Sequence, residues 1–457
     1  MIRRSIVLAL AAAIAPLSAN ADDLLQTYEM ARNGDPTLAI AESTRLYNKE
    51  GEVQARAALL PQISGSAGLT RTNTDTDGIS GTVTTKRRNY TANLSQTLFD
   101  WSQFATLRAQ RALSQAADYT LVSANDDLMV RTATAYFDVL VAIESLSAAQ
   151  TAEAAAKRQF EYADKRLEVG LAPITDVYEA RAQYDDARAN TINAKNVLED
   201  SYQALVQLAG QPVRNLRALP DNFNPQLPTG YNNIDGWVRA AITQNPALQA
   251  YDYQTRSAQA SVESARGGHY PSLALNGSWG KSATWGDATG AGGLTAGSET
   301  NSVGIALTVP IFTGGATQSR VRQALAQRDN AQDQYELQRR QLERNTRNLY
   351  QSLVAGVSKI EAQRSAVESA QSAYDASLVG LEVGTRTVLD VVQNQRTLFA
   401  AQVTYAQSKY EFLLNRLLLA QAAGEIDIAN LRDVNLLLTE DAESKLTDEA
   451  PAATRAQ

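Results

Sequence analysis

Four polar residues have types and spacing that could do chemistry: Thr175, Asp176, Arg386 and Asp390. They follow Gly170 and Gly384, two glycines at equivalent positions 214 residues apart, within residues 168–177 and 382–391. A carboxylate a few residues after a glycine that ends a helix can cap the start of the next helix or attract a cation. An arginine nearby supplies the fork-shaped donor that pairs best with a carboxylate. These residues therefore predict ionic pairing and ion attraction rather than bond making.

The rest of the chain lacks the residues of an enzyme. It has no cysteine and one histidine, His269, beside the start of a predicted strand. No metal-ligand spacing, phosphate loop or nucleophile elbow is present in the sequence. We predict that the protein is not an enzyme and has no catalytic residue, no cofactor and no bound metal.

Composition and the first residues indicate an exported protein. A basic pair, an apolar run and the sequence Ala19-Asn20-Ala21 predict that residues 1–21 are a signal peptide, which is removed. Without cysteine, we expect neither a lipid anchor nor disulfides. No later run approaches the ~20 apolar residues of a membrane helix. The net charge of -7 argues against nucleic acid as a partner.

Both glycines interrupt long alanine-rich helical patterns. Glycine adopts the left-handed conformation at low cost and so ends helices, and the aspartate six residues later can cap the next one. Asp176 with Glu179, and Asp390 with Gln393, have the spacing of a capping box. Each stretch is therefore predicted to be a tight turn between two helices.

The chain is an internal duplication with a period of about 210 residues. Asp35-Pro36-Thr37-Leu38 matches Asn245-Pro246-Ala247-Leu248, for example. The predicted organisation is a first repeat over 22–211, a proline-rich connector over 212–233, a second repeat over 234–424 and an acidic, loosely ordered tail over 425–457.

Each repeat holds two segments in which apolar and polar residues alternate, the period of a strand. They cover residues 61–72 and 88–99, then 271–282 and 301–312, and the intervening stretches 71–88 and 281–300 are predicted to be mobile loops. Strands of this length with one apolar face cross outer membranes. Four strands cannot close a barrel, and an open edge cannot stand in lipid. Several copies must therefore pool strands, and two would give eight strands where three would give twelve.

The helical patterns that follow the strands are too long for a globule. Residues 101–169 and 315–383 would each run ~100 Å. Their apolar residues recur at alternating spacings of three and four, which is a coiled-coil seam. Alone, these helices also fit a periplasmic coiled-coil scaffold without a pore. The strands favour a channel, in which the helices continue the barrel as a hollow cylinder.

The turn stretches, Val169-Gly170-Leu171-Ala172-Pro173-Ile174-Thr175-Asp176-Val177 and Val383-Gly384-Thr385-Arg386-Thr387-Val388-Leu389-Asp390-Val391, resemble the paired helix-turn motifs of the TolC family of outer-membrane efflux and secretion channels. The likeness covers essentially all of the chain after the signal peptide. It implies a mixed fold class: a transmembrane β-barrel continuing into a long α-helical coiled-coil barrel. The protomer would be internally duplicated with four strands, and the trimer would form a twelve-stranded barrel in the cell outer membrane, with its helical tunnel in the periplasm.

The resemblance also implies a gate at the helical turns. Asp390 would contribute to a ring of carboxylates at a constricted entrance, and the family's second ring aspartate falls on Gln393. Arg386 would pair with Thr175 and Asp176, across the two hairpins or between neighbours. A further gate residue of the family, a tyrosine, falls on Leu381, so part of the family network is missing here.

The resemblance implies partners as well. A periplasmic adaptor would dock on the exposed turns, at Val169, Gly170, Leu171, Val383, Gly384 and Thr385. The predicted function is a passive outer-membrane exit duct for tripartite efflux and type I secretion, which conducts drugs or proteins from an inner-membrane RND or ABC transporter. The alternatives are the pore-free scaffold and a constitutively open porin.

Overall fold

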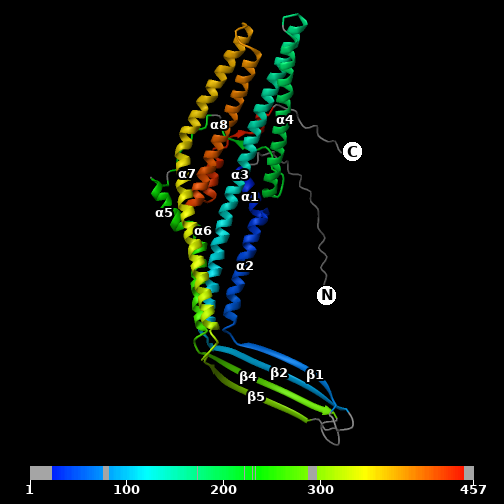
Figure 1. The fold of residues 1–457 in the computed structure, drawn as a ribbon, viewed down its shortest axis with the longest axis vertical. Coiled ribbons are helices and arrows are strands. Elements are labelled where there is room, and N and C mark those ends of the chain that lie inside the picture. The colour runs from blue at the N-terminus through cyan, green and yellow to red at the C-terminus, as the bar shows by residue number, and fades with distance from the viewer. Residues whose placement is uncertain are drawn as a thin grey trace, which may run out of the picture. The chain divides into compact units, whose positions relative to one another are not determined.

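The computed structural model describes residues 23–75, 82–171, 173–220, 222–228, 230–231, 233–286 and 296–446. The predicted signal peptide, residues 1–21, lies outside these ranges. The chain divides into two compact units, and Figure 1 labels helices and strands that belong to them. Unit 1 comprises Met1–Pro36, Asn125–Trp237 and Thr346–Gln457, and unit 2 comprises Thr37–Ala124 and Val238–Asn345. Each unit thus takes segments from both sequence repeats.

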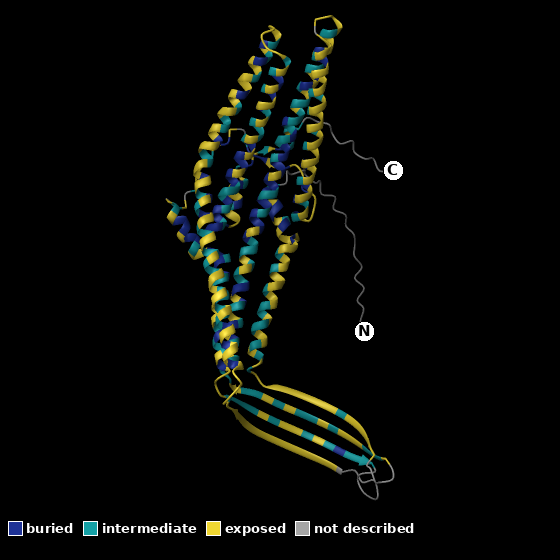
Figure 2. Cartoon of the chain, viewed as in Figure 1, coloured by how far each residue is buried: buried dark blue, intermediate teal, exposed yellow. Residues whose placement is uncertain are grey.

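Unit 2 contains one antiparallel sheet of four strands. They are β1 (Gln62–Thr74), β2 (Val83–Phe99), β4 (Ser272–Gly286) and β5 (Ala296–Thr308), in the order β1-β2-β4-β5. The two repeats therefore meet in the middle of the sheet, where β2 pairs with β4. In the described chain β1 pairs only with β2, and β5 only with β4, so both outer strands keep an open edge. Figure 2 shows these outer strands exposed along most of their length.

The two faces of the sheet differ in polarity. One face carries apolar side chains that are exposed in the single chain, and among them are Ile63, Leu69, Val303, Ile305 and Leu307. The other carries hydroxyl pairs across neighbouring strands, such as Ser66 with Thr91 at 2.7 Å and Ser278 with Ser302 at 2.7 Å. The alternation in sequence thus becomes one apolar and one polar face, as a strand with a period of two requires.

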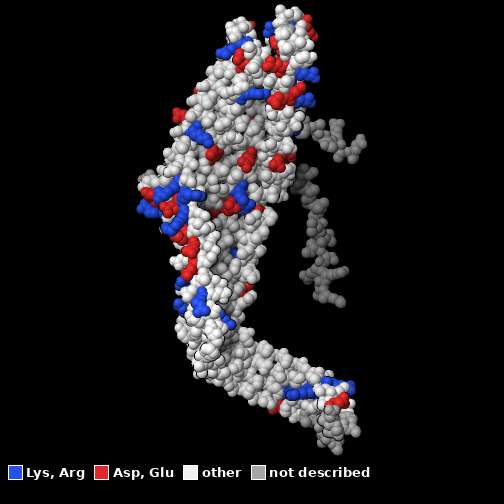
Figure 3. Space-filling model, viewed as in Figure 1, with Lys and Arg blue, Asp and Glu red and all other residues white. Residues whose placement is uncertain are grey.

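Charge divides the sheet along its strands. An uncharged band, residues 62–70, 89–99, 272–280 and 300–308, contains no Lys, Arg, Asp or Glu. The strand charges lie beyond it, at the ends distant from the helices: Arg71, Lys86, Arg87, Arg88, Lys281 and Glu299. Figure 3 shows this division on one face of the sheet. The band has the ~9–11-residue length of a membrane-crossing strand.

The strand bounds correct two of the sequence predictions. Parts of the supposed loops are strand, because residues 71–74, 83–88, 281–286 and 296–300 continue the ladders with polar side chains. The last strand ends at Thr308 and not at residue 312. Pro310 accounts for this early end, since proline has no N–H to donate to a ladder.

Unit 2 also contains four long helical segments. They are α2 (Pro36–Ala57), α6 (Pro246–Gly267) and the leading parts of α3 (Trp101–Glu168) and α7 (Ala316–Glu382). Gly267 permits α6 to approach α3, since an added Cβ would lie 2.6 Å from the backbone nitrogen of Ser102. Higher up, Tyr119 of α3 stacks on Tyr253 of α6 with ring centroids 5.4 Å apart.

Unit 1 contains two helical hairpins and three shorter helices. The remainder of α3 pairs with α4 (Ile174–Ala209), and the remainder of α7 pairs with α8 (Val388–Ala423). The shorter helices are α1 (Leu24–Gly34), α9 (Ile428–Asn435) and the start of α5 (Ile234–Gln244), whose residues from Val238 onward belong to unit 2. Buried aromatic rings join the two hairpins, with Phe137 stacked on Tyr410 at 5.6 Å. None of the helices in the described chain is long and apolar enough to cross a membrane.

The C-terminal segment contradicts the prediction of a loosely ordered tail over 425–457, at least as far as residue 446. Helix α9 buries Leu431 and Val434 completely. The short strand β6 (Glu440–Asp441) then pairs with β3 (Arg217–Ala218), which lies in the supposedly irregular connector. The prediction of a loosely ordered tail relied on the acidic composition and overlooked Leu431 and Val434, which have the spacing of one helix face. Residues 447–457 lie outside the described chain.

Asp35 provides a test of the packing in unit 1. Its side chain is 3% exposed, and Arg131 of α3 donates to it from Nη2 at 2.8 Å and Nη1 at 3.5 Å. Replacing Arg131 by Met removes the main partner of a buried carboxylate, and we expect this change to lower the free energy of unfolding by about 3 kcal/mol.

Urea unfolding of the purified protein in detergent, followed by circular dichroism, measures this loss. The control is Arg340→Met, which breaks an exposed pair with Glu336 and should change the stability by less than about 0.5 kcal/mol. Equal unfolding midpoints for Arg131→Met and the wild type would contradict the role assigned to this pair.

Candidate functional site: the two helical turns

The first turn joins α3 to α4 and is closed by backbone hydrogen bonds. Gly170 has φ of 75° and donates its N–H to Leu167 O at 2.9 Å. Leu171 donates to Arg166 O at 2.8 Å, which completes a Schellman motif. Only glycine adopts this φ without steric cost, so the helix stop predicted from Gly170 is confirmed.

The second turn joins α7 to α8 and repeats this geometry. Gly384 has φ of 79° and donates to Leu381 O at 3.2 Å, and Thr385 donates to Gly380 O at 2.8 Å. Here the Gly380 carbonyl also accepts the backbone N–H of Arg386 at 3.1 Å. The second turn thus has one more backbone hydrogen bond of this kind than the first, and it places Arg386 next to Thr387, the residue that precedes α8.

Asp176 does not cap α4 as predicted. The N-cap is Pro173, which makes no side-chain cap bond, and Asp176 is the third residue of the helix. The capping box with Glu179 is therefore not formed. Proline has a φ suited to the helix start, so this helix begins without a polar cap. Asp176 instead places a negative charge in the first turn, where the helix dipole favours it.

Asp390 takes part in a capping box, but not in the predicted role. Thr387 is the N-cap, and its hydroxyl accepts the N–H of Asp390 at 3.2 Å. The Asp390 carboxylate accepts the Thr387 N–H and hydroxyl, both at 2.9 Å. The predicted partner Gln393 is exposed and outside the box. These bonds from Thr387, with a smaller contribution from the Arg386 charge, lower the pKa of Asp390, so its carboxylate is ionised at neutral pH.

The hairpins are linked within the chain by residues that the sequence did not single out. Arg396 of α8 donates from Nη2 to Asp186 at 2.7 Å and to Gln183 at 2.8 Å, both on α4. Within the described residues, Arg386 makes no hydrogen bond or ion pair with Thr175 or Asp176. Residues 186 and 396 lie in the helices after the turns, so the motif itself carried no signal for them. The link between Arg396 and Asp186 becomes apparent only in the structure, where α4 and α8 lie next to each other.

Apolar side chains project from both turns. Val169 is 69% exposed, Leu171 68% and Val383 68%. A small cluster supports the first turn from behind, with Ala163, Val177 and Ala180 buried and Phe160 and Leu167 packed against it. An added Cβ at Gly170 or Gly384 would meet no atom within 4 Å. The predicted docking residues thus lie in hydrogen-bonded turns with accessible apolar surface.

The described part of a single chain offers no metal site, since no group of three or more His, Cys, Asp or Glu side chains gathers there. Leu381, at the position of the family's gate tyrosine, is half-buried and uses its carbonyl in the turn. Any ion site at Asp390 therefore depends on carboxylates from other copies.

Comparison with known proteins places these features in context. The family model described as outer membrane efflux protein matches residues 27–211 and 237–425. Outer membrane protein TolC of Escherichia coli (strain K12) is 33% identical over 444 residues, which cover 94% of this chain and 88% of the relative. Alkaline protease secretion protein AprF of Pseudomonas aeruginosa is 29% identical over 423 residues, which cover 89% and 85%. The solved Campylobacter jejuni CmeC outer membrane channel shares the fold, with a TM-score of 0.75 and 20% identity over 92% of this chain and 90% of that one.

The capping box of α8 is directly testable. Thr387→Val keeps the side-chain shape but removes the hydroxyl that bonds Asp390. Because a lowered carboxylate pKa stabilises the fold above the ordinary pKa of aspartate, the effect is fully present at pH 7. We expect amide hydrogen exchange in residues 388–391 to be about fivefold faster at that pH.

Exchange measured by mass spectrometry reports this change. Thr397→Val is the matched control, because the Thr397 hydroxyl bonds only Gln393 O within the same helix. Unchanged protection at the start of α8 in Thr387→Val would show that the box does not hold this helix end.

Proposed function

The chain belongs to the outer membrane efflux protein family, and from this premise we propose that three copies form one channel gated at the helical turns. The protein is located in the outer membrane and is an exit duct for efflux and secretion. The following proposals concern how this chain forms, closes and connects that duct.

The open sheet edges support assembly of several copies. In lipid, unpaired N–H and C=O groups on β1 and β5 would be very costly, so the β1 edge of one copy pairs with the β5 edge of the next. Three copies then supply twelve strands, with the apolar faces toward lipid and the hydroxyl-rich faces toward the lumen. The uncharged band supports this arrangement, because it has the length of the hydrocarbon region on all four strands.

The gate is proposed to consist of ionic contacts between copies. Arg386 has no partner at Thr175 or Asp176 within the described chain, so the predicted pairing is assigned to a neighbouring copy. Arginine and a carboxylate form a strong, directional pair, which breaks only when the turns move apart. The Arg396–Asp186 pair adds a link between the two hairpins of one copy and is proposed to hold them together in the closed state.

Asp390 is proposed to form the cation-attracting ring. One carboxylate from each of three copies at a narrow entrance would concentrate cations there. Mutual repulsion would raise the pKa values of the ring above that of an isolated Asp390, while the Thr387 bonds lower them. With Gln393 in place of a second aspartate, this chain has one ring rather than two, and cation preference rests on Asp390.

The exposed turns are proposed to receive a periplasmic adaptor. Val169, Leu171 and Val383 present apolar surface, and the flanking glycines leave room for another helix to come close. Helical hairpin tips of an adaptor fit such a groove. The adaptor would connect the duct to an inner-membrane RND or ABC transporter, which supplies the energy that the duct lacks.

Single-channel conductance in a planar bilayer tests the gate. We expect a small, cation-preferring conductance for the wild type. Asp176→Ala and Arg386→Ala should each raise the open probability about tenfold, since a charge-assisted contact that favours the closed state is lost. Asp390→Asn should reduce the cation preference.

The control for the gate is Arg188→Ala, which removes an exposed arginine of α4 away from the turns. A large wild-type conductance that ignores these substitutions would support the open porin instead. Folded, membrane-inserted protein without any conductance would refute the channel.

Site-specific cross-linking tests the docking surface. Because the natural chain has no cysteine, a single introduced thiol reacts at one place only. Leu171→Cys and Val383→Cys carrying a photoactivatable cross-linker should capture the adaptor in cells. Ile192→Cys, on the exposed side of α4 at 62% exposure, should not. Equal capture at all three positions would mean that the adaptor does not recognise the turns.

A further inference from the structure

Three exposed basic residues gather where the uncharged band of the sheet ends on β1 and β2. Arg71 is the first residue beyond the band on β1, and Arg88 is the first on β2. In the ladder, Arg71 lies directly opposite Lys86, and Arg88 lies opposite Leu69. Residues that lie opposite each other in a ladder share one face of the sheet. These three cations, the basic triad, therefore lie on the apolar face, which carries Leu69.

We propose that the basic triad binds the phosphate headgroup of a membrane lipid, whose acyl chains run along the apolar face of the sheet. This inference rests on the proposed barrel, in which the apolar face meets lipid. Because the helical tunnel is in the periplasm, the strand ends distant from the helices lie at the outer surface of the membrane. The lipid is therefore one of the outer leaflet.

Like charges face each other in the basic triad. Side chains directly opposite in an antiparallel pair have Cβ atoms ~4.5–5.5 Å apart, and like charges there destabilise a sheet. Arg71 donates from Nε to Asn73 Oδ1 at 3.3 Å, which uses one of its five N–H groups. Among the described residues, no carboxylate forms an ion pair with the triad. A phosphate between these side chains would offset their repulsion.

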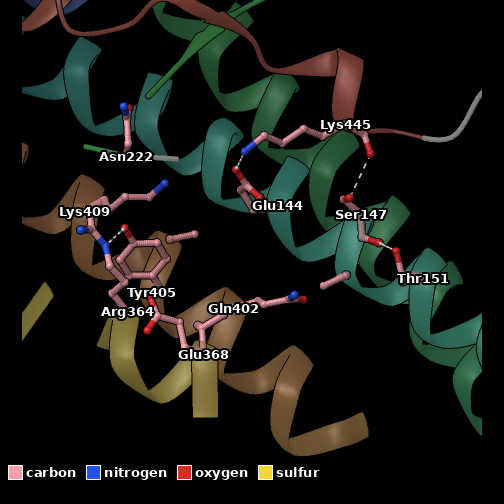
Figure 4. Close-up of a pocket in the computed structure, with 13 residues that line it drawn as sticks. Glu144, Ser147, Thr151, Asn222, Arg364, Glu368, Gln402, Tyr405, Lys409 and Lys445 are labelled. Atoms are coloured by element: carbon pink, nitrogen blue, oxygen red, sulfur yellow. Dashed lines mark hydrogen bonds and ion pairs between the residues drawn. The ribbon is translucent and has the colours of Figure 1, made fainter. Parts of the chain in front are cut away.

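Cations elsewhere in the chain have carboxylate partners. On the same face of the sheet, Lys281 of β4 lies opposite Glu299 of β5, with Nζ 3.8 Å from Oε2. In unit 1, Figure 4 shows Lys445 bonded to Glu144, with Nζ 2.7 Å from Oε1. The β4–β5 side of the apolar face thus pairs its cation with an acid across the ladder, whereas the β1–β2 side places cation opposite cation.

The side chains around the triad fit both parts of a phospholipid. Each guanidinium group presents a planar set of donors to phosphate oxygens, and the lysine adds a compact charge. Toward the band, Leu69 and Tyr90 lie on the same face and are 76% and 47% exposed. They offer apolar surface to acyl chains, and tyrosine is typical of the level at which chains and headgroups meet. Free phosphate would use only the upper half of this surface.

Native mass spectrometry of the purified full protein in detergent counts the lipids bound to each assembly and gives their affinity. The probe is dimyristoyl phosphatidate, with dimyristoylglycerol as the body without phosphate and inorganic phosphate as the head alone. We expect phosphatidate to bind about tenfold or more tightly than either. Arg71→Gln and Arg88→Gln should each weaken phosphatidate binding about tenfold, since a charge-assisted contact is lost.

The matched control is Arg87→Gln. Arg87 lies between Lys86 and Arg88 in the sequence but opposite Thr70 in the ladder, on the hydroxyl-rich face. Its replacement removes the same charge from the other side of the sheet and should leave the affinity for phosphatidate unchanged. Equal weakening by Arg87→Gln would mean that overall charge attracts the lipid, and would overturn the site.

Unchanged affinity in both triad variants would also overturn it. That result is expected if Asp77 or Asp287, which lie outside the described chain, neutralises these cations. Equal affinity for dimyristoylglycerol would rule out phosphate recognition, and equal affinity for inorganic phosphate would rule out a lipid. If one triad variant fails to assemble, the other decides. Trimers without selective lipid binding would contradict the lipid site alone, whereas monomers only would contradict the proposed barrel as well.

Discussion

Unpaired backbone groups on the two outer strands are the constraint on which the rest of this protein depends. A sheet of four strands with an apolar face has to enter lipid, yet β1 and β5 each leave one edge without hydrogen bonds. The chain alone has no remedy, because its remaining length is committed to helices. Pairing with other copies supplies the missing bonds, and that pairing in turn brings the helices of several copies around one axis.

Duplication provided two hairpins of the same design, which differ at the start of the second helix of each hairpin. Both turns are closed by a glycine with positive φ and the same pair of backbone bonds. The α4 helix starts after Pro173 without a polar cap, whereas α8 starts with Thr387 and Asp390 in reciprocal bonds. The start of α8 is therefore capped by side chains, and the start of α4 is not. The capped helix is the one that carries Asp390, the carboxylate proposed for the entrance.

The sequence predicted those features that depend on one residue and its neighbours along the chain. Gly170 and Gly384 marked the turns because their conformation excludes other residues, and alternation marked the apolar face of the sheet. Contacts between helices that are distant in the sequence were not predictable. Arg396 and Asp186 do not belong to one sequence motif. The capping of α4 and α8 was predicted wrongly because the N-cap residues are Pro173 and Thr387 rather than the two aspartates. Polar strand ends such as residues 83–88 were wrongly predicted to be loops. They lack the alternation of apolar and polar residues that marks a strand with one face toward lipid.

The pairing of β2 with β4 has a consequence for how the protein reaches its membrane. Of the four strand-to-strand seams per copy in a closed barrel, three (β1-β2, β2-β4 and β4-β5) form within the chain, and the fourth forms only with a neighbouring copy. No single copy is therefore a complete insertion unit. Because a closed barrel needs copies to meet, we expect the rate of insertion to rise steeply with the concentration of exported chains. A copy without neighbours keeps two unpaired strand edges, which are very costly in lipid.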